Sequence, residues 1–266
     1  MLADIMLGQY FPGNSVIHNL DPRTKIISTI LFISSIFLAE NYQAYSIVAI
    51  FVGAIIIIAG IPIIMILRSL KPLWIIILLT MLIHIFTTPG TAIYFLGPLT
   101  VTQEGVHLGM LMSIRLMFLI VISSLLTFTT SPVTLTDGIE RLLKPFKKIG
   151  LPAHELAMMM TIALRFIPTL LEETDRIMKA QKARGADFTS GNIVRRARNL
   201  IPLLVPLFIS AFRRADELAT AMEARCYRGG DHRTRMKQLK ITNQDWVAYG
   251  ILLLLIGVLI IVRVNK

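Results

Sequence analysis

Five long apolar runs dominate this 266-residue sequence and limit what it can fold into. A helix needs about 20 mostly apolar residues to cross the hydrocarbon core of a bilayer. Three of the runs are close to that length, and flanking Ser, Thr and Tyr residues extend the other two. The pattern predicts an all-α integral membrane protein with about five transmembrane helices. The runs are Ile26–Ala39, Ala44–Pro62, Pro72–Phe86, Gly109–Phe128 and Trp246–Val262.

The charges between the runs favour one orientation. The links at 40–45 and 87–104 contain no Lys or Arg, whereas basic residues precede the first run and separate the second from the third. Because Lys and Arg concentrate on the cytoplasmic side of membrane proteins, the basic links are expected inside the cell. The N-terminus would then be cytoplasmic.

Most of the positive charge lies in one block. Residues 132–240 hold 20 of the 27 Lys and Arg and 11 of the 16 Asp and Glu, which leaves the block at +9. We therefore divide the chain into 1–131, with an N-terminal segment and four transmembrane helices, 132–240, a cytoplasmic coupling region, and 241–266, the last transmembrane helix. The basic residues alternate with acids and aliphatics, a pattern that argues against nucleic-acid binding.

The basic block has a helical organisation of its own. We expect a short helix over 132–150 and two long crossing helices, from Pro152 to near Gly185 and from Asn192 to before Gly229. Internal prolines predict kinks in both long helices. Their apolar first halves could be short spans, but proline breaks and charged second halves favour buried or interfacial helices. These first halves are Leu156–Leu171 and Leu200–Phe212.

Two segments of the long helices, 172–185 and 213–226, align without gaps at an offset of 41 residues. The alignment pairs Asp175 with Asp216 and places the pairs Ala183-Arg184 and Ala224-Arg225 at the expected helix ends. A helix C-terminus attracts cations, so either arginine alone could reflect that ordinary preference. Two matched sites favour a second interpretation, in which each guanidinium reaches past a helix tip to a partner's carboxylate.

The same segments resemble a known family. Residues 165–185, from Arg-Phe-Ile-Pro to Ala-Arg-Gly, and residues 213–228, from Arg-Arg-Ala-Asp to Ala-Arg-Cys-Tyr-Arg, are similar to the two signatures of the transmembrane subunit of energy-coupling-factor transporters, the CbiQ-like family. The segments Gly8–Gly13 and Leu20–Lys25 match as well. The resemblance covers essentially the whole chain. Cys226 departs from it, because the family motif often ends in glycine there, which affects the local turn.

The resemblance implies a scaffold in a bacterial plasma membrane importer of vitamins or metal ions. Two homologous ATPase subunits would each receive one arginine in a groove, and the long helices would pass their motion to one substrate-binding membrane subunit. The resemblance leaves open a scaffold shared by interchangeable vitamin-binding subunits and one dedicated to cobalt, nickel or biotin, and the N-terminal segment favours the shared type. The residues implied in docking are Ala183, Arg184, Gly185, Ala224, Arg225 and Cys226. Those implied in supporting the coupling helices are Asp175, Asp216, Arg165, Glu172 and Arg213.

The sequence points away from catalysis by this chain. No glycine is followed by lysine, so no phosphate-binding loop is recognisable and ATP hydrolysis would fall to partner subunits. No cofactor or metal site is expected, because His154-Glu155 lacks the second histidine of a metalloprotease motif. A self-sufficient ion-coupled secondary transporter is the alternative, although the five runs contain no Asp or Glu. Arg115, inside the fourth run, is expected to face a helix-end carbonyl, Glu104 or a partner subunit.

Overall fold

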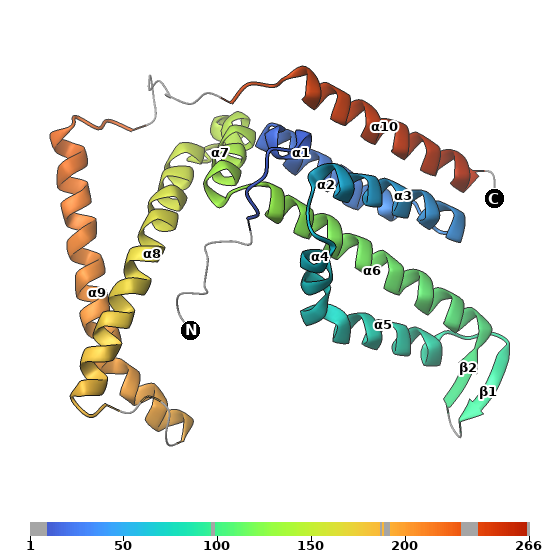
Figure 1. The fold of residues 1–266 in the computed structure, drawn as a ribbon, viewed down its shortest axis with the longest axis horizontal. Coiled ribbons are helices and arrows are strands. Elements are labelled where there is room, and N and C mark those ends of the chain that lie inside the picture. The colour runs from blue at the N-terminus through green and yellow to red at the C-terminus, as the bar shows by residue number, and fades with distance from the viewer. Residues whose placement is uncertain (1–9, 97–98, 187, 189–191, 230–238, 265–266) are drawn as a thin grey trace. The chain divides into compact units, whose positions relative to one another are not determined.

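The computed structural model describes residues 10–96, 99–186, 188, 192–229 and 239–264. The chain forms two compact units. The described part of the first, here called the bundle unit, consists of residues 10–138 and 239–264. The described part of the second, the two-helix unit, lies within 139–229. Figure 1 shows the helices of both units, which agree with the predicted all-α class.

The bundle unit is a set of apolar helices packed around aliphatic and aromatic side chains. Ile36, Val48 and Leu259 are fully buried at its centre, and they come from three different helices. In a bilayer such packing is stabilised mainly by van der Waals contacts, because lipid tails are as apolar as these side chains. The described elements are α1 (Val16–Asn19), α2 (Pro22–Ile36), α3 (Tyr42–Ala59), α4 (Ile63–Leu70), α5 (Trp74–Thr87), β1 (Ala92–Leu96), β2 (Leu99–Thr102), α6 (Gln103–Thr129) and α10 (Asn243–Val264).

Five helical segments of the described chain are long and apolar enough to cross a membrane: Tyr42–Ala59, Ile63–Thr87, Gln103–Thr129, Ala153–Ala183 and Asn243–Val264. The count agrees with the sequence prediction, but the set differs. The run at 26–39 lies mostly in α2, whose 15 residues give about 22 Å of helix, less than a bilayer core of about 30 Å. The first long coupling helix, by contrast, has the length and composition of a span.

Two links also differ from the expectation. Arg68 and Lys71 were expected between spans, yet they lie in α4 and in a 3₁₀ turn at Lys71–Leu73 that continues directly into α5. Figure 1 shows α4 and α5 meeting at an angle there. The link at 87–104 contains an antiparallel hairpin, in which Ala92 pairs with Thr102 and Leu96 with Leu99. Its β-branched and aromatic residues favour strands.

Glycines allow α5 and α6 to pack closely. A Cβ atom on Gly105 would lie 2.7 Å from the carbonyl oxygen of His84, and one on Gly109 would lie 3.0 Å from that of Met81. Both approaches are to backbone, which cannot move aside easily. Small residues at such contacts let membrane helices approach one another closely.

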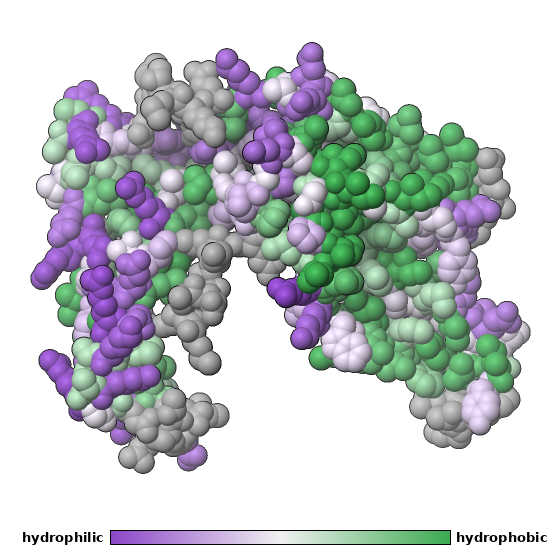
Figure 2. Space-filling model, in the orientation of Figure 1, coloured by the Kyte–Doolittle hydropathy of each residue, from purple (hydrophilic) through white to green (hydrophobic). Residues whose placement is uncertain are grey.

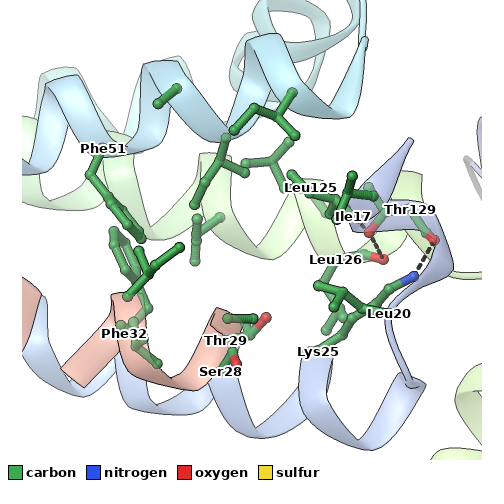
Figure 3. A pocket seen from close by; sticks show the side chains of 18 of the residues that line it. Ile17, Leu20, Lys25, Ser28, Thr29, Phe32, Phe51, Leu125, Leu126 and Thr129 are labelled. Carbon is green, nitrogen blue, oxygen red and sulfur yellow. Dashed lines mark hydrogen bonds between the residues drawn. The ribbon is translucent and has the colours of Figure 1, made fainter. Parts of the chain in front are cut away.

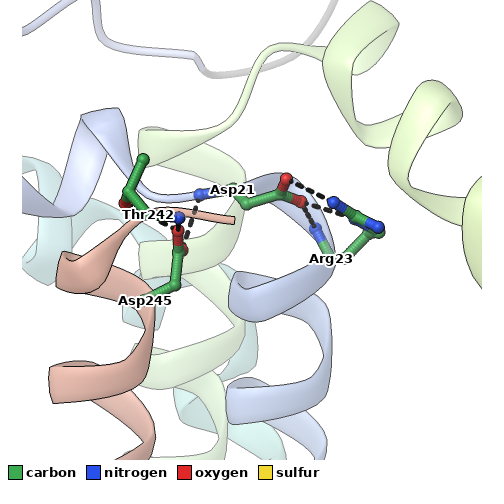
Figure 4. Close-up of polar contacts among 4 residues, drawn as sticks. All are labelled: Asp21, Arg23, Thr242 and Asp245. Atoms are coloured by element: carbon green, nitrogen blue, oxygen red, sulfur yellow. Dashed lines mark hydrogen bonds and ion pairs between the residues drawn. The ribbon is translucent and has the colours of Figure 1, made fainter. Parts of the chain in front are cut away.

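Buried polar groups fasten the helix ends of the bundle unit. The carboxylate of Asp245, at the start of α10, accepts hydrogen bonds from the backbone N–H of Asp21 (2.9 Å) and from the N–H and hydroxyl of Thr242 (2.7 and 2.8 Å) (Figure 4). Asp21 caps α2 by accepting from Arg23 N–H and pairs with the Arg23 guanidinium at 2.9 Å. The starts of α2 and α10 are thereby joined.

Arg115 has a structural partner of the expected kind. Its guanidinium donates to the carbonyl oxygen of Ala39, just after α2, and to the hydroxyl of Tyr45, each at 3.0 Å. It also lies 5.4 Å from the centre of the Phe37 ring. A charge inside an apolar helix is costly unless it meets such groups. The helix-end carbonyl, rather than Glu104, is the partner found.

An apolar cavity of about 450 Å³ lies among α1, α2, α3, α6 and α10 (Figure 3). Phe32, Phe51 and Leu125 are among the side chains that line it. At one end, the buried ammonium of Lys25 donates to the carbonyl oxygens of His18 (2.9 Å) and Thr129 (2.8 Å). Cavities lined by aliphatic groups accommodate apolar molecules and exclude water. The lining is mainly apolar, and its polar side chains are Lys25, Ser28, Thr29, Thr129 and Gln244.

The two-helix unit is built from α8 (Ala153–Ala183) and α9 (Ile193–Ala224), with 31 and 32 residues. It follows α7 (Pro132–Leu143) and a 3₁₀ segment at Lys144–Ile149, so the short helix expected over 132–150 is present in two pieces. Asn192 is the N-cap of α9, as predicted. Figure 2 shows hydrophilic side chains concentrated over α8 and α9, whereas α3, α5 and α6 are covered mainly by hydrophobic ones.

Candidate functional site

Both long helices end in the same turn. In α8, Gly185 N–H donates to Lys182 carbonyl and Ala186 N–H to Gln181 carbonyl, each at 3.0 Å. This pair of bonds is the Schellman motif, which ends a helix by reversing the chain through a left-handed residue. That residue is Gly185, with φ +87°. Arg184 is the C-cap directly before it.

The end of α9 repeats both bonds of this motif. Cys226 N–H donates to Glu223 carbonyl at 2.8 Å, and Tyr227 N–H donates to Met222 carbonyl at 3.0 Å. Arg225 is the C-cap, and Cys226 takes the left-handed conformation with φ +56°. The departure from glycine therefore leaves the turn intact. It costs about 1 kcal/mol, because a Cβ atom disfavours this region of backbone space.

The two caps present the arginines in the same way. Ala183, Arg184, Ala224 and Arg225 are all exposed, so each arginine is accessible at a helix end and follows an exposed alanine in the chain. The last carbonyls of a helix carry partial negative charge, which stabilises a cation at that position. The backbone geometry is thus alike at the two sites, as the alignment of segments 172–185 and 213–226 predicts. The charges of the two last turns differ, because α8 has Lys182 there and α9 has Glu223.

A polar contact joins the middle of the two helices. The carboxylate of Glu173 on α8 accepts from the Ser210 hydroxyl at 2.6 Å and from the Arg214 guanidinium at 2.9 Å, both on α9. We call these three residues the crossing contact. Glu173 lies 11 residues before Arg184, and Arg214 lies 11 residues before Arg225. The contact is therefore about 16 Å along either helix from its arginine.

The supporting residues named from sequence have different positions. Asp175 pairs with Lys179 at 2.6 Å within α8, as its helical spacing suggests. Arg165, Glu172, Arg213 and Asp216 are exposed. The residues that join the helices are the direct neighbours of two of them, Glu173 and Arg214. The alignment pairs Glu173 with Arg214 at the offset of 41, but it does not report that the two side chains face each other.

His154 occupies a second polar contact of the two-helix unit. Its Nδ1 lies 3.1 Å from a carboxylate oxygen of Glu140 in the last turn of α7, and its Nε2 lies 3.3 Å from the Tyr227 hydroxyl. Sequence reasoning weighed His154 only as a metal ligand. Among the described residues, no group of three or more His, Cys, Asp or Glu side chains is placed to hold a metal ion.

A face of α9 consists of exposed hydrophobic side chains. They recur three or four residues apart on the side away from the crossing contact, and their exposed fractions range from 43% to 69%. We call this set the α9 apolar face: Ile201, Leu204, Val205, Phe208 and Phe212. A contiguous apolar surface of this kind marks a contact with another protein or with lipid.

Comparison with known proteins gives consistent results. A family model described as a cobalt transport protein, CbiQ, matches residues 13–236. The chain is 62% identical over 260 residues to the energy-coupling factor transporter transmembrane protein EcfT of Acidaminococcus fermentans. This alignment covers 98% of this chain and 97% of that protein. It is 53% identical to the EcfT protein of Clostridium kluyveri over 266 residues (99% and 98%). The EcfT protein of Bacillus subtilis is 48% identical over 264 residues (99% and 100%).

Identity at this level over nearly the full length of several chains shows common family membership. The match includes both helix tips and the crossing contact, since the family model extends from residue 13 to residue 236. The chain belongs to the CbiQ family, among the transmembrane proteins of energy-coupling factor transporters.

Proposed function

We propose that this chain is the membrane scaffold that transmits ATP-driven motion from two ATPase subunits to a substrate-binding membrane subunit, and that it performs no chemistry itself. The observation that carries the proposal is the pair of matched helix tips. Arg184 and Arg225 are presented by the same Schellman cap, and both are exposed next to an exposed alanine. One chain with two equal tips suits two related partners, one for each tip.

The chemistry of the tips suits a protein groove lined by carboxylates. A guanidinium offers five N–H donors in a planar fork and stays charged at physiological pH. The preceding Ala183 and Ala224 leave room for a partner's backbone to approach the helix end. Each ATPase subunit would therefore provide an acidic groove that receives a helix tip. ATP hydrolysis belongs to those subunits, because the sequence of this chain contains no phosphate-binding loop.

The crossing contact gives the two tips a mechanical relation. Figure 1 shows α8 and α9 running in opposite directions, so their tips are at opposite ends of the pair. Glu173 is as far from Arg184 along α8 as Arg214 is from Arg225 along α9. A movement of either tip would therefore turn its helix about the crossing contact. ATPase subunits that close together would change the angle between the helices.

The substrate-binding subunit would contact the α9 apolar face. Its side chains have no partner within the described chain that covers them, and they are too exposed to be core. A change of helix angle would move this face and tilt the bound subunit, which would release its cargo. A vitamin or a metal ion would be bound by that subunit, and one scaffold would serve interchangeable subunits.

We place the protein in the bacterial plasma membrane, with the two-helix unit on the cytoplasmic side, where ATP is available. The block at 132–240 has a net charge of +9, which the positive-inside rule assigns to the cytoplasm. On this topology α8, despite its span-like composition, lies at the membrane surface. Labelling of an engineered cysteine in α8 by a membrane-impermeant thiol reagent, with the reagent applied to one side at a time, tests the placement.

Co-purification tests the docking itself. Arg184→Glu, Arg225→Glu and the double variant are expressed with the ATPase subunits, and the ratio of ATPase to scaffold is measured. Loss of one partner of a desolvated ion pair costs about 3–5 kcal/mol, so each variant should lose its ATPase by at least about 100-fold in affinity. Arg198→Glu, an exposed charge reversal near the start of α9, is the control. If the double variant retains both ATPase subunits, the docking proposal is wrong.

A further inference from the structure

The segment that follows α9 is hydrogen-bonded to the start of α8. The Tyr227 hydroxyl lies 3.3 Å from Nε2 of His154, and Nδ1 of His154 lies 3.1 Å from Glu140. An ionised carboxylate only accepts, so Nδ1–H donates to Glu140. In the neutral imidazole Nε2 then accepts from the tyrosine O–H, and in the imidazolium Nε2–H donates to the tyrosine oxygen, so the bond forms in either state. A continuous chain of bonds therefore runs from the end of α9 through α8 to the last turn of α7. We call these three residues the tether.

Tyr227 belongs to the helix cap as well as to the tether. Its backbone N–H makes the 3.0 Å bond to Met222 that closes the Schellman motif, and it follows Arg225 by two residues. The same residue thus holds the arginine tip through its main chain and the start of α8 through its side chain. A force on Arg225 must move the start of α8 too, or break the bond between Tyr227 and His154.

The other tip cannot form the same link. The residue at the corresponding position of the α8 cap is Ala186, whose N–H makes the equivalent bond to Gln181. Its methyl group has neither a donor nor an acceptor. The two caps therefore have the same backbone but differ in side-chain chemistry at this position.

We propose that His154 is a positioning residue that couples displacement of the Arg225 tip to the junction of α7 and α8, whereas Ala186 gives the Arg184 tip no such link among the described residues. The two ATPase subunits would then act on the scaffold unequally, although they dock to matched arginines. This inference rests on the proposed function, because it requires an ATPase to move the Arg225 tip. The side chains of His154 and Glu140 are only 25% and 15% exposed, so water competes weakly for their bond.

The test measures whether the tip and the start of α8 move together. Spin labels are placed on Cys226, the native free cysteine, and on Glu155→Cys at the exposed position next to His154. Their separation is measured in nanodiscs, in the complex with the ATPase subunits, with and without ATP. The tether predicts one narrow distance that nucleotide does not change. Tyr227→Phe removes one bond, which should raise the separated population about fivefold and make it depend on ATP. His154→Ala removes both bonds of the imidazole and should raise that population at least as much.

Two variants keep the result independent of folding. Tyr227→Phe removes only a hydroxyl, and His154→Gln restores one donor and one acceptor, so partial return to the narrow distance is expected. A wild-type distance that changes with ATP overturns the inference, and so does a Tyr227→Phe distance identical to the wild-type one. The variant Arg225→Glu distinguishes failure of this inference from failure of the proposed function. If it retains the ATPase subunits, the proposed function fails as well; if it releases them while the tether variants show no effect, only the present inference fails.

Discussion

Replacing Glu173 with alanine removes the acceptor that joins α8 to α9. The carboxylate holds the Ser210 hydroxyl at 2.6 Å and the Arg214 guanidinium at 2.9 Å, and both donors would lose it at once. The helices would still share apolar contacts, so the variant weakens the crossing contact without deleting the interface. The angle between the helices should then become less well defined.

The magnitude follows from the degree of burial. The side chains of Arg214 and Glu173 are 36% and 25% exposed, which places the pair between a surface pair and a buried one. A surface ion pair contributes about 0.2–1 kcal/mol, whereas breaking a buried one costs about 3–5 kcal/mol. We expect a loss of about 1–2 kcal/mol for Glu173→Ala, because the pair is partly screened and one neutral hydroxyl is involved. This loss is a factor of about 5–30 in the population of the packed helix pair.

Spin labels on the exposed positions Arg176 and Glu217, in a chain with Cys226→Ser, report the separation of α8 and α9. Glu173→Ala should add a second, longer distance to the distribution, and Arg214→Ala should do the same. The double variant should show no larger effect than either single one, because both remove the same contact. Asp175→Ala is the matched control, since its pair with Lys179 lies within one helix and contributes below about 0.5 kcal/mol. Equal effects of Glu173→Ala and Asp175→Ala would refute the reasoning.

Three further predictions concern local structure. Cys226→Gly should stabilise the α9 cap by up to about 1 kcal/mol, and Gly185→Ala should weaken the α8 cap by a similar amount. Amide hydrogen exchange in the last turn of each helix measures both changes. Changes of the opposite sign to these would contradict the left-handed conformation of the two caps. Asp245→Ala should cost about 1–3 kcal/mol, because the buried N–H of Asp21 loses its acceptor and the exposed Thr242 loses its two bonds to the carboxylate. An unchanged thermal unfolding midpoint in detergent would count against it. Gly105→Ala should lower that midpoint, whereas Gly257→Ala, which has open space around it, should leave it unchanged or higher; equal midpoints would exclude a close α5–α6 contact.

Sequence patterns predict the helices of this protein well, because apolar runs and capping residues act locally. The start of α9 at Asn192 and the end of α8 beside Gly185 follow from such signals. The assignment of spans is less direct. The run at 26–39 extends past the end of α2 at Ile36, since hydropathy does not report where a helix stops. The hairpin at 92–102 was not predicted, because the link was interpreted from its lack of Lys and Arg and not from the strand propensity of its residues.

The candidate site shows the same division. The paired arginines and their helix-end positions are visible in the sequence, and the repeat at an offset of 41 predicts that the caps match. Contacts between helices depend on rotation about each axis, which the alignment does not contain. Glu172 and Arg213 were therefore named although their neighbours Glu173 and Arg214 form the contact. The partner of His154 lies 73 residues away at Tyr227, a separation that no local pattern reports.

The most direct measurement uses the position of Cys226 beside Arg225. This residue is the single cysteine of the chain and is exposed, so a photoreactive thiol reagent can be attached there alone. Ala186→Cys in a Cys226→Ser chain places the same reagent at the other tip. In the assembled complex, illumination should cross-link each tip to an ATPase subunit, with a different subunit captured at each. Capture of lipid alone at both tips, while the ATPase subunits stay bound to the complex, would contradict the account.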